Sequence, residues 1–336
     1  MATRFEIVLH GDNPVSLRAA GEEALAEIER LENQLSLYRP ASEIAHLNAR
    51  AAHEWVRVSP AVFRLLRQAK QLSDESGGAF DITVGPLIRC WGFMGANGAM
   101  PDPRAVAEAR AKVGMQLVRL NETDSTVRFA SDGVMLDLGA IGKGYAIECA
   151  AELLREAGVS SALLHGGTSS VQAIGRPPEA DGWNVAIEYP AASVASGAAG
   201  GVARNPPSEV RSDVLAVVPL RDEAMSVSAV WGKSFQSEGK TFGHVIDPRT
   251  GAPAMGALLA TVVLPSVTET DALSTALLTL GLGGHDRIAR LRHNMRSLVL
   301  ERAEGPTPYR VSANGIDVQP KAFATISARL GGEKEN

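Results

Sequence analysis

Helix-like and strand-like segments do not alternate strictly along this sequence, and this order constrains the fold more than any single motif does. Apolar residues recur at helical spacing in five segments, at 14–37, 60–76, 103–113, 144–157 and 269–280. Strand-like runs fall at 1–10, in a hairpin over 117–134, at 162–164, 183–189, 214–220 and 260–264, and in a C-terminal hairpin around Val299 and 309–311. A doubly wound sheet needs a helix after nearly every strand, so the sequence predicts an α+β fold rich in antiparallel sheet.

The chain is long enough for one large domain or two smaller ones, with 336 residues of which 45% are hydrophobic. One stretch, 190–213, is rich in Ala, Gly, Ser and Pro, and we interpret it as a long mobile loop and not as a linker between domains. The sequence contains no repeat that would divide it. We therefore expect a single domain over 1–336, with a flexible tail at 325–336.

The formal net charge is −5, and no run of Lys and Arg occurs. Nucleic acids and anionic membranes bind largely through clustered cations, so neither is expected as a partner. The N-terminus alternates like a strand and lacks both a signal sequence and an apolar run of roughly 18 residues, so we expect no transmembrane segment and a cytoplasmic location. Cys90 and Cys149 lack CxxC spacing, which favours two buried thiols over a disulfide or a metal pair.

Two glycine-containing segments offer places where the main chain can approach a ligand closely. The first, 78–87, contains Phe80 and Asp81, an apolar face and an acceptor, although a capped turn explains it equally well. The second, 136–146, runs from a strand through a glycine turn into a helix, so that exposed N–H groups and Lys143 could hold a phosphate. It has the spacing of neither a P-loop nor a GxGxxG motif, and a tight structural turn is the alternative.

Two further segments carry side chains suited to catalysis or metal binding. His244 is followed three residues later by Asp247 and then by a Pro-Arg-Thr-Gly turn, so it is as good a candidate for a catalytic histidine as for a structural one. Asp271 and Thr275 lie four residues apart near the start of a helix, hence on one side of it, where a carboxylate and a hydroxyl suit a hard cation such as Mg²⁺. An N-cap formed by Thr270 or Asp271 is the alternative.

These segments, in this order, resemble the FAD:protein FMN transferase family (ApbE-like proteins). The resemblance extends from Met1 to about Gly284. Its matching pieces are Met1-Ala2-Thr3, 35–40 with Ser42-Glu43 and Leu47-Asn48, Ala79-Phe80-Asp81, Pro86-Leu87, Trp91-Gly92-Phe93, the turn at 137–146, 244–251 and 271–275. Each piece is short, but their order and spacing make the resemblance specific.

The resemblance implies the family's antiparallel-sheet-rich flavin transferase fold, with two packed T-fold-like halves as one arrangement of it. The family's flavin contacts fall, position by position, on Met1, Tyr38, Ala79, Phe80, Asp81, Asp137, Lys143 and Val245. Its metal ligands fall on Asp271, Thr275 and the main-chain carbonyl of Ala140. The resemblance also implies FAD as a substrate, Mg²⁺ as a cofactor, and an acceptor flavoprotein with a target Thr or Ser as the partner.

The implied reaction moves FMN from FAD to the acceptor hydroxyl and releases AMP. Mg²⁺ would bridge the diphosphate, His244 would act as the general base, and Asp247 would either orient His244 or shape the turn. Two other functions stay open on the sequence alone. They are Mg-dependent hydrolysis of FAD to FMN and AMP, and FAD binding without catalysis.

Four departures from the family pattern bear on these alternatives. Gly166-Gly167-Thr168 stands where the family has Gly-Gly-Asp, and Val227-Ser228-Ala229 stands where it has Thr-Ser-Gly. Ser274 stands where some members have a second Asp, which implies a weaker metal site. The segment 190–213 is longer than usual. The predicted metal ligands and the histidine are retained, which argues against an inactive enzyme.

Overall fold

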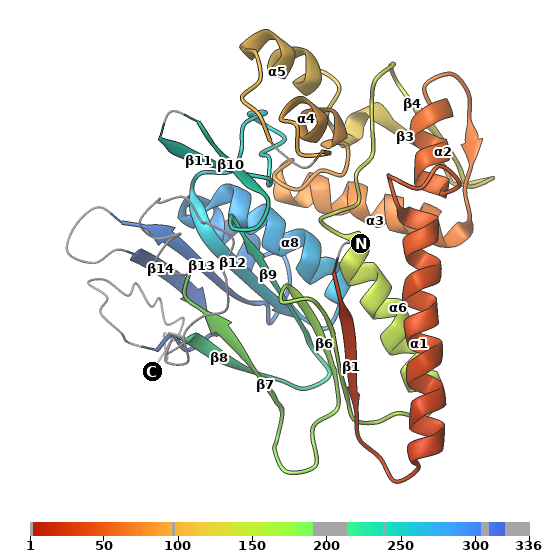
Figure 1. Ribbon diagram of the computed structural model, residues 1–336, viewed down its shortest axis with the longest axis vertical. Coiled ribbons are helices and arrows are strands. Elements are labelled where there is room, and N and C mark those ends of the chain that lie inside the picture. Colours follow the sequence, from red (N-terminus) through yellow and green to blue (C-terminus); the bar gives the residue numbers. More distant parts are fainter. Residues whose placement is uncertain (1–2, 96–97, 191–213, 238, 304–308, 320–336) are drawn as a thin grey trace, which may run out of the picture.

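A seven-stranded antiparallel sheet forms the centre of the protein (Figure 1). The computed structural model describes residues 3–95, 98–190, 214–237, 239–303 and 309–319. In order across the sheet, the strands are β1 (Phe5–Leu9), β5 (Ala162–Gly166), β6 (Ser170–Ile174), β9 (Ala224–Ala229), β12 (Ala257–Leu264), β13 (Arg296–Arg302) and β14 (Tyr309–Asn314). Every neighbouring pair in this sheet is antiparallel, so the predicted α+β class is confirmed.

Three helices cover one face of this sheet: α1 (Pro14–Leu35), α6 (Gly142–Glu156) and α8 (Val267–Leu280). Helix α1 lies alongside α6, and α6 packs on α8, which in turn contacts β9 and β12 (Figure 1). Small side chains on α6, Ala146, Ala150 and Ala151, are fully buried and permit close helix packing. The main hydrophobic core lies between these helices and the sheet.

The other face of the sheet is covered by a hairpin of β7 (Trp183–Glu188) and β8 (Val214–Leu220). Leu259 and Val263 of β12 point into this second core, while Ala260 and Val262 point into the first. Strand β12 is therefore buried on both sides. This explains why its sequence is a nearly continuous apolar run and not an alternating one.

A second group of elements packs beyond α1 and α8. It comprises α2 (Glu43–Arg50), α3 (Pro60–Ser76), η1 (Met115–Leu117), and a small sheet of β2 (Val56–Arg57), β4 (Thr126–Phe129) and β3 (Val118–Asn121). Helix α3 contacts α8, while η2 (Leu282–Gly284) and α9 (His285–Ala289) follow α8 and lead into β13.

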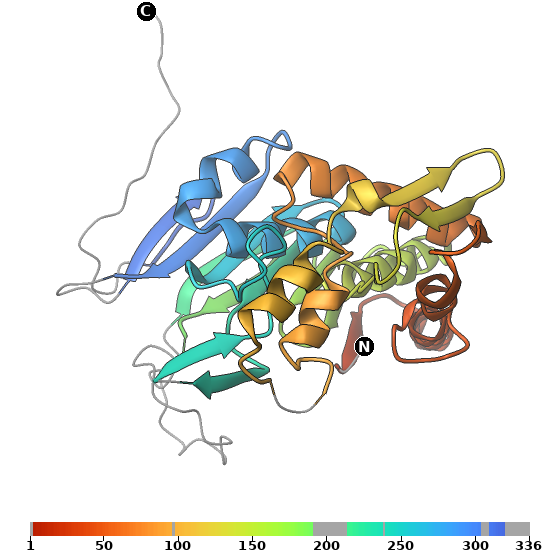
Figure 2. The same cartoon turned by 90° about the horizontal axis from the view of Figure 1, so that it is seen from above.

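An aromatic cluster joins α4 (Gly85–Cys90) and α5 (Pro103–Arg110) to the hairpin of β10 (Ser234–Ser237) and β11 (Lys240–Gly243). Its rings are those of Trp91, Phe93, Phe235 and Phe242, with centroids 5.3 to 6.3 Å apart. Both views show this hairpin beside α4 and α5 (Figures 1 and 2). The segment that precedes His244 is thereby anchored by apolar packing.

Most predicted elements are confirmed, with shifts at their ends. The predicted helix at 60–76 is observed as α3, and the C-terminal hairpin is observed as β13 and β14. Helix α8 begins earlier than predicted because the Ser266 hydroxyl accepts the N–H of Glu269 at 3.2 Å and so caps the helix. The alternative in which Thr270 or Asp271 caps this helix is therefore wrong.

Three of the predicted segments cannot be compared with the structure. Met1, residues 191–213 of the predicted loop and the predicted tail at 325–336 lie outside the described residues. Cys90 and Cys149 are free thiols, each half-buried where full burial was expected. Among the described residues, no helix has both the length and the hydropathy needed to span a bilayer. The division into two T-fold-like halves stays a prediction.

Candidate functional site

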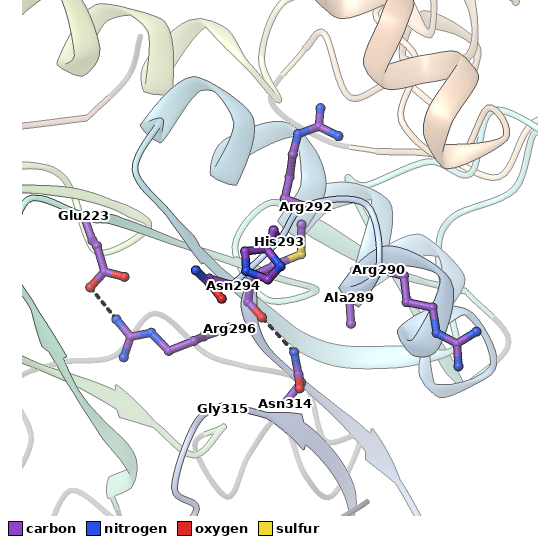
Figure 3. Close-up of a pocket in the computed structure, with 10 residues that line it drawn as sticks. Glu223, Ala289, Arg290, Arg292, His293, Asn294, Arg296, Asn314 and Gly315 are labelled. Atoms are coloured by element: carbon purple, nitrogen blue, oxygen red, sulfur yellow. Dashed lines mark hydrogen bonds and ion pairs between the residues drawn. The ribbon is translucent and has the colours of Figure 1, made fainter. Parts of the chain in front are cut away.

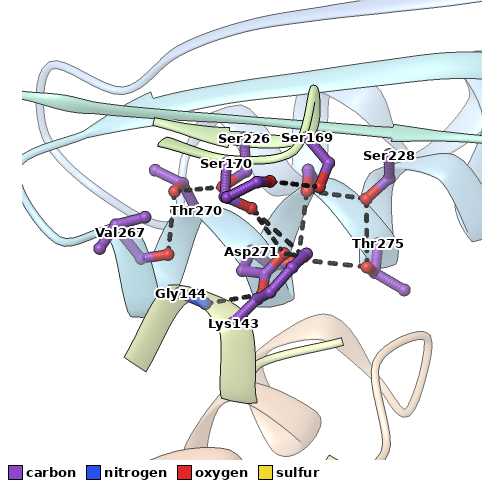
Figure 4. A network of polar contacts seen from close by, with 12 residues as sticks. Lys143, Gly144, Ser169, Ser170, Ser226, Ser228, Val267, Thr270, Asp271 and Thr275 are labelled. Atoms are coloured by element: carbon purple, nitrogen blue, oxygen red, sulfur yellow. Dashed lines mark hydrogen bonds and ion pairs between the residues drawn. The ribbon is translucent and has the colours of Figure 1, made fainter. Parts of the chain in front are cut away.

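The carboxylate of Asp271 joins the N-terminus of α6 to the first turns of α8 (Figure 4). Its Oδ1 lies 2.9 Å from the ammonium nitrogen of Lys143, and its Oδ2 accepts the main-chain N–H of Gly144 at 3.0 Å. The side chain of Asp271 is only 5% exposed. Lys143 and Asp271, 128 positions apart in sequence, thus form with Gly144 a charged, nearly buried cluster. We refer to this cluster as the polar corner; such a contact is expected for two segments of one site.

Gly144 is required by the close approach of these two helices. A Cβ at this position would overlap the main-chain oxygen of Val267 and lie 2.9 Å from the Cβ of Asp271. Gly142, in contrast, has space, because a Cβ there would meet only the Cβ of Leu138 at 3.6 Å. The glycine turn therefore brings the N-terminus of α6 against α8 through a contact that only glycine permits.

Hydroxyl groups line the adjacent side of α8. Thr275 donates its hydroxyl to the main-chain oxygen of Asp271 at 3.1 Å, as expected for a threonine one helical turn later. The hydroxyl of Ser228 on β9 lies 3.2 Å from that of Thr275 and 2.9 Å from that of Ser274. The serine retained from the family's Thr-Ser-Gly pattern thus contacts a predicted metal ligand.

This donor set fits a hard cation that brings most of its own ligands. It contains one carboxylate and several hydroxyl oxygens, and in the described residues no three or more His, Cys, Asp or Glu side chains gather in a group that could hold a metal. Mg²⁺ is commonly held by one or two carboxylates, with water and substrate phosphate completing its shell. In the structure, the ammonium of Lys143 compensates the negative charge of Asp271. A bound cation would compensate the same charge. Ala140 lies two residues before α6, at the same turn.

Segments 79–84 and 135–137 run side by side at this end of the molecule. Asp137 donates its N–H to the oxygen of Ile82 at 2.7 Å, and Val84 bridges to Met135. Asn48, from the Leu47-Asn48 piece of the resemblance, holds Leu136 from both sides through its amide: Oδ1 accepts the N–H at 2.7 Å and Nδ2 donates to the oxygen at 3.0 Å. Three predicted segments are therefore fixed to one another, two by main-chain contacts and the third by the side-chain amide of Asn48.

The side chain of Asp81 is fully engaged within the fold. Its Oδ1 accepts the N–H and the hydroxyl of Thr83 at 2.8 and 2.6 Å, and its Oδ2 accepts the N–H of Met115 at 3.0 Å and the hydroxyl of Ser73 at 3.3 Å. Burial raises the pKa of this carboxyl, and the hydrogen bonds oppose that shift. Ala79 and Phe80 are each 1% exposed, so their side chains also belong to the core.

Tyr38 is exposed at the edge of these segments, and Asp137 beside it is partly buried. Tyr38 is 64% exposed, and the pKa of its hydroxyl is raised first by partial burial and then by the charge of Asp137. Asp137 accepts the N–H of Gly139 at 2.8 Å, and burial raises the pKa of its carboxyl. An accessible aromatic face thus lies close to the glycine turn.

His244 follows directly after β11, and its ring is held by main chain. Its Nδ1 lies 3.2 Å from the carbonyl oxygen of Lys233, and its N–H donates to the same oxygen at 3.1 Å. Burial lowers the pKa of the imidazole, the contact with the Lys233 carbonyl opposes this shift, and the charge of Lys233 adds to it. Lys233 lies five positions after Ser228. The main chain therefore runs from Ser228, which contacts Thr275, to Lys233, which contacts His244.

Asp247 shapes the turn after His244. Its Oδ1 accepts the main-chain N–H of Arg249 at 2.9 Å, and its two oxygens pair with the guanidinium at 2.9 and 2.8 Å. The main-chain oxygen of Asp247 also accepts the N–H of Gly251 at 2.8 Å. Of the two roles considered for Asp247, these contacts support the turn-shaping one, while the Lys233 carbonyl orients the imidazole.

A cavity of about 800 Å³ lies elsewhere, between α9, β13 and β14 (Figure 3). Its lining includes Arg290, Arg292, His293 and Arg296, and no residue predicted for the site. Arg292 pairs with Glu75 and Glu269 at 2.8 and 2.7 Å, and Arg296 pairs with Glu223 at 2.7 Å. These pairs largely offset its positive charge, so the polar corner at Asp271 is the stronger candidate.

Comparison with known proteins agrees with this geometry. The model of the ApbE family matches residues 1–299. The chain belongs to the ApbE family. The resemblance inferred from the sequence motifs is therefore confirmed, including its extent over most of the chain.

Several ApbE family members are similar over most of their length. An FAD:protein FMN transferase of Treponema pallidum is 32% identical over 296 residues, covering 84% of this chain and 77% of the relative. One of Klebsiella pneumoniae is 31% identical, covering 86% of this chain and 85% of the relative. Among solved structures, the Pseudomonas stutzeri flavinyl transferase ApbE is 27% identical with a TM-score of 0.75, covering 93% of this chain and 95% of that one. The ApbE protein of Thermotoga maritima is 25% identical with a TM-score of 0.76, covering 89% and 90%.

Sequence reasoning missed one residue of the corner, Ser170. Its hydroxyl donates to Oδ1 of Asp271 at 3.2 Å and accepts from the Lys143 ammonium at 3.3 Å. Ser170 is the first residue of β6, which was not predicted as a strand. It lies 101 positions from Asp271, so no local spacing could have revealed the contact.

Proposed function

We propose that this protein transfers FMN from FAD to a Thr or Ser hydroxyl of an acceptor protein and releases AMP. The observation that carries the proposal is the corner where Asp271 meets Lys143 and the N-terminus of α6, in a chain that belongs to the ApbE family. A helix N-terminus beside a lysine suits a diphosphate. Relatives of this length and similarity are FAD:protein FMN transferases, which supports the same reaction here.

FAD would lie across the glycine turn. The main-chain N–H groups at the start of α6 and the ammonium of Lys143 would hold the diphosphate, and the exposed ring of Tyr38 would stack on an aromatic ring of FAD. Because the side chains of Ala79, Phe80 and Asp81 are committed to the fold, we propose that this segment contributes main-chain contacts. Flavin contacts at Met1, Asp137 and Val245 are proposed from the family resemblance alone.

Asp271, the hydroxyl of Thr275 and the carbonyl of Ala140 would hold Mg²⁺. When bound, this ion supplies positive charge that offsets the charge developing on the phosphates. Lys143 would leave its pair with Asp271 and donate to a phosphate oxygen instead. The polar corner is nearly buried, so the charges there act on the reacting phosphate with little screening by water.

His244 would act as the general base. Its Nδ1–H donates to the Lys233 carbonyl in this assignment, so Nε2 carries the free lone pair. The lowered pKa keeps the imidazole neutral near pH 7. The acceptor oxygen forms a bond to the phosphorus of the FMN half, the bond from that phosphorus to the bridging oxygen breaks, AMP leaves with that oxygen, and the hydroxyl proton passes to Nε2.

The decisive experiment incubates the protein with FAD, Mg²⁺ and an acceptor protein, and measures the acceptor's mass and the released nucleotides. We expect an acceptor heavier by one FMN and an equal amount of AMP. Free FMN and AMP without a modified acceptor would instead identify hydrolysis by water. Intact FAD that remains bound would identify a flavin-binding protein without this activity.

A further inference from the structure

We infer that Ser170 is a positioning residue for the proposed metal site, which holds the carboxylate of Asp271 in the orientation that a divalent cation needs. The inference rests on the proposed function, because it takes Asp271 as a metal ligand. Ser170 itself is not placed on the metal.

The position of Ser170 is fixed by the central sheet. It pairs with Gly166 on β5 and with Ser226 on β9, and its side chain is fully buried against α8. The main-chain oxygen of the preceding Ser169 accepts the N–H of Val227 at 2.7 Å, which ties the start of β6 to β9. The hydroxyl therefore projects from a rigid element toward the start of α8 (Figure 4).

Two donors fix the two oxygens of Asp271 separately. The N–H of Gly144 binds Oδ2 at 3.0 Å, and the hydroxyl of Ser170 binds Oδ1 at 3.2 Å. With one donor on each oxygen, the carboxylate cannot rotate about its Cβ–Cγ bond without losing both hydrogen bonds. Partners of this kind fix the orientation of metal ligands, and their loss weakens metal binding by about 10- to 100-fold.

Ser170 also remains in place when Lys143 moves. The ammonium of Lys143 now contacts both Ser170 and Asp271, at 3.3 and 2.9 Å, and it is the group that would turn toward a phosphate. The buried serine cannot leave with it. Ser170 would then be the contact that keeps Oδ1 aligned after the ammonium of Lys143 has left.

The chain provides a matched control for an ordinary structural role. Ser226 is the cross-strand neighbour of Ser170, is equally buried, and also bonds to α8, with its hydroxyl 2.8 Å from that of Thr270. Thr270 immediately precedes Asp271. Ser170→Ala and Ser226→Ala therefore each delete one buried hydroxyl contact between the sheet and α8, but only Ser170→Ala removes a contact of the Asp271 carboxylate.

The test titrates Mn²⁺, which binds similar oxygen ligands, into each variant in the presence of saturating FAD, with the same FAD alone as the reference, and follows the free ion by electron paramagnetic resonance. We expect Ser170→Ala to raise the Mn²⁺ dissociation constant about tenfold or more, and Ser226→Ala to leave it within about twofold. In assays of FMN transfer, the Mg²⁺ concentration for half-maximal rate should rise for Ser170→Ala alone, while the rate at saturating Mg²⁺ stays close to wild type. Thermal melting should show a similar, small loss of stability in both variants.

Asp271→Ala distinguishes the two ways in which the inference can fail. If Asp271→Ala abolishes Mn²⁺ binding while Ser170→Ala binds like Ser226→Ala, the metal site stands and the role of Ser170 is refuted. The metal site of the proposed function fails if Asp271→Ala binds Mn²⁺ as tightly as the wild type does. It also fails if the wild type itself binds no Mn²⁺. In either case the role of Ser170 fails with it.

Discussion

The ring nitrogen Nδ1 of His244 lies 3.2 Å from the main-chain oxygen of Lys233. A main-chain carbonyl can only accept a hydrogen bond, so this contact favours the tautomer with the proton on Nδ1 and leaves the lone pair on Nε2. It also fixes the ring without placing a negative charge beside it. A carboxylate at this place would raise the pKa, whereas here burial lowers it.

The proposed role of His244 predicts a pH profile. The base must be neutral, and its pKa lies below the ordinary value of 6.5, so kcat/KM should be level above about pH 6.5 and fall in more acidic solution. His244→Ala should reduce transfer by about 10²- to 10⁴-fold and remove this acidic limb. FAD binding, followed by flavin fluorescence, serves as the control and should persist. If kcat/KM of His244→Ala still falls in acidic solution, the group that titrates is not His244.

Gly144→Ala should disturb the packing of α6 against α8 at the site. The new Cβ would overlap the oxygen of Val267, so α6 and α8 must separate, at a cost of about 1–3 kcal/mol in the free energy of unfolding. The same movement lengthens the Gly144–Asp271 hydrogen bond, so Mg²⁺-dependent transfer should fall as well. Urea unfolding measures the first effect and a Mg²⁺ titration the second.

Gly142→Ala is the matched control for this substitution. A Cβ at Gly142 meets only Leu138 at 3.6 Å, and alanine favours a helix over glycine by about 0.5–1 kcal/mol. We therefore expect a neutral or slightly stabilised protein. Equal losses of stability in the two variants would show that helix separation at Gly144 is not the cause.

The sequence predicted helices better than it predicted the strands that carry the site. The apolar spacing of α3 is local and reads directly as a helix. Strands β6 and β9 were missed because the residues that face α8, such as Ser170, Ser226 and Ser228, are hydroxylic where a core strand would be apolar. Because these hydroxylic residues lie on the face toward α8, the two strands lack the alternation of apolar and polar residues that predicts a strand.

The same limit applies to single site residues. Asp81 and Asp271 are both carboxylates in segments with small neighbours, and the sequence cannot tell which of them has oxygen lone pairs left for a ligand. The structure separates them, because four donors from the fold occupy Asp81, whereas one of the three donors to Asp271 is the ammonium of Lys143, whose charge a bound cation could replace. The role of such a residue depends on contacts that form only in the folded chain.

A pair of substitutions tests this distinction. In Asp81→Asn, one oxygen becomes an NH₂ group that faces existing donors, so we expect a loss of about 1–3 kcal/mol in the free energy of unfolding. Asp137→Asn keeps an oxygen for the N–H of Gly139, so its loss should be smaller. Urea midpoints compare the two. If Asp81→Asn instead unfolds like the wild type but binds FAD more weakly, its carboxylate contacts the flavin directly.

His285 provides a pH prediction for stability. The imidazole is buried between two strands, with Nε2 2.8 Å from the Ser297 hydroxyl and Nδ1 2.7 Å from that of Ser312. Burial lowers its pKa below 6.5, while the charge of Asp286 opposes the shift. The folded protein therefore binds this proton less readily than the unfolded chain does. The contribution to stability is complete above about pH 6.5 and is lost as the pH falls toward the folded pKa, by at most about 1.4 kcal/mol per pH unit.

His285→Gln should remove this part of the pH dependence. Glutamine cannot take up a proton in this range, so the free energy of unfolding of the variant, although lower at pH 7, should decline less between pH 6.5 and 5 than that of the wild type. His293→Gln is the control, because His293 is exposed and should leave the slope unchanged. Urea unfolding at a series of pH values gives both slopes. A slope for His285→Gln equal to that of the wild type would mean that His285 is not the group whose protonation weakens the fold in acid.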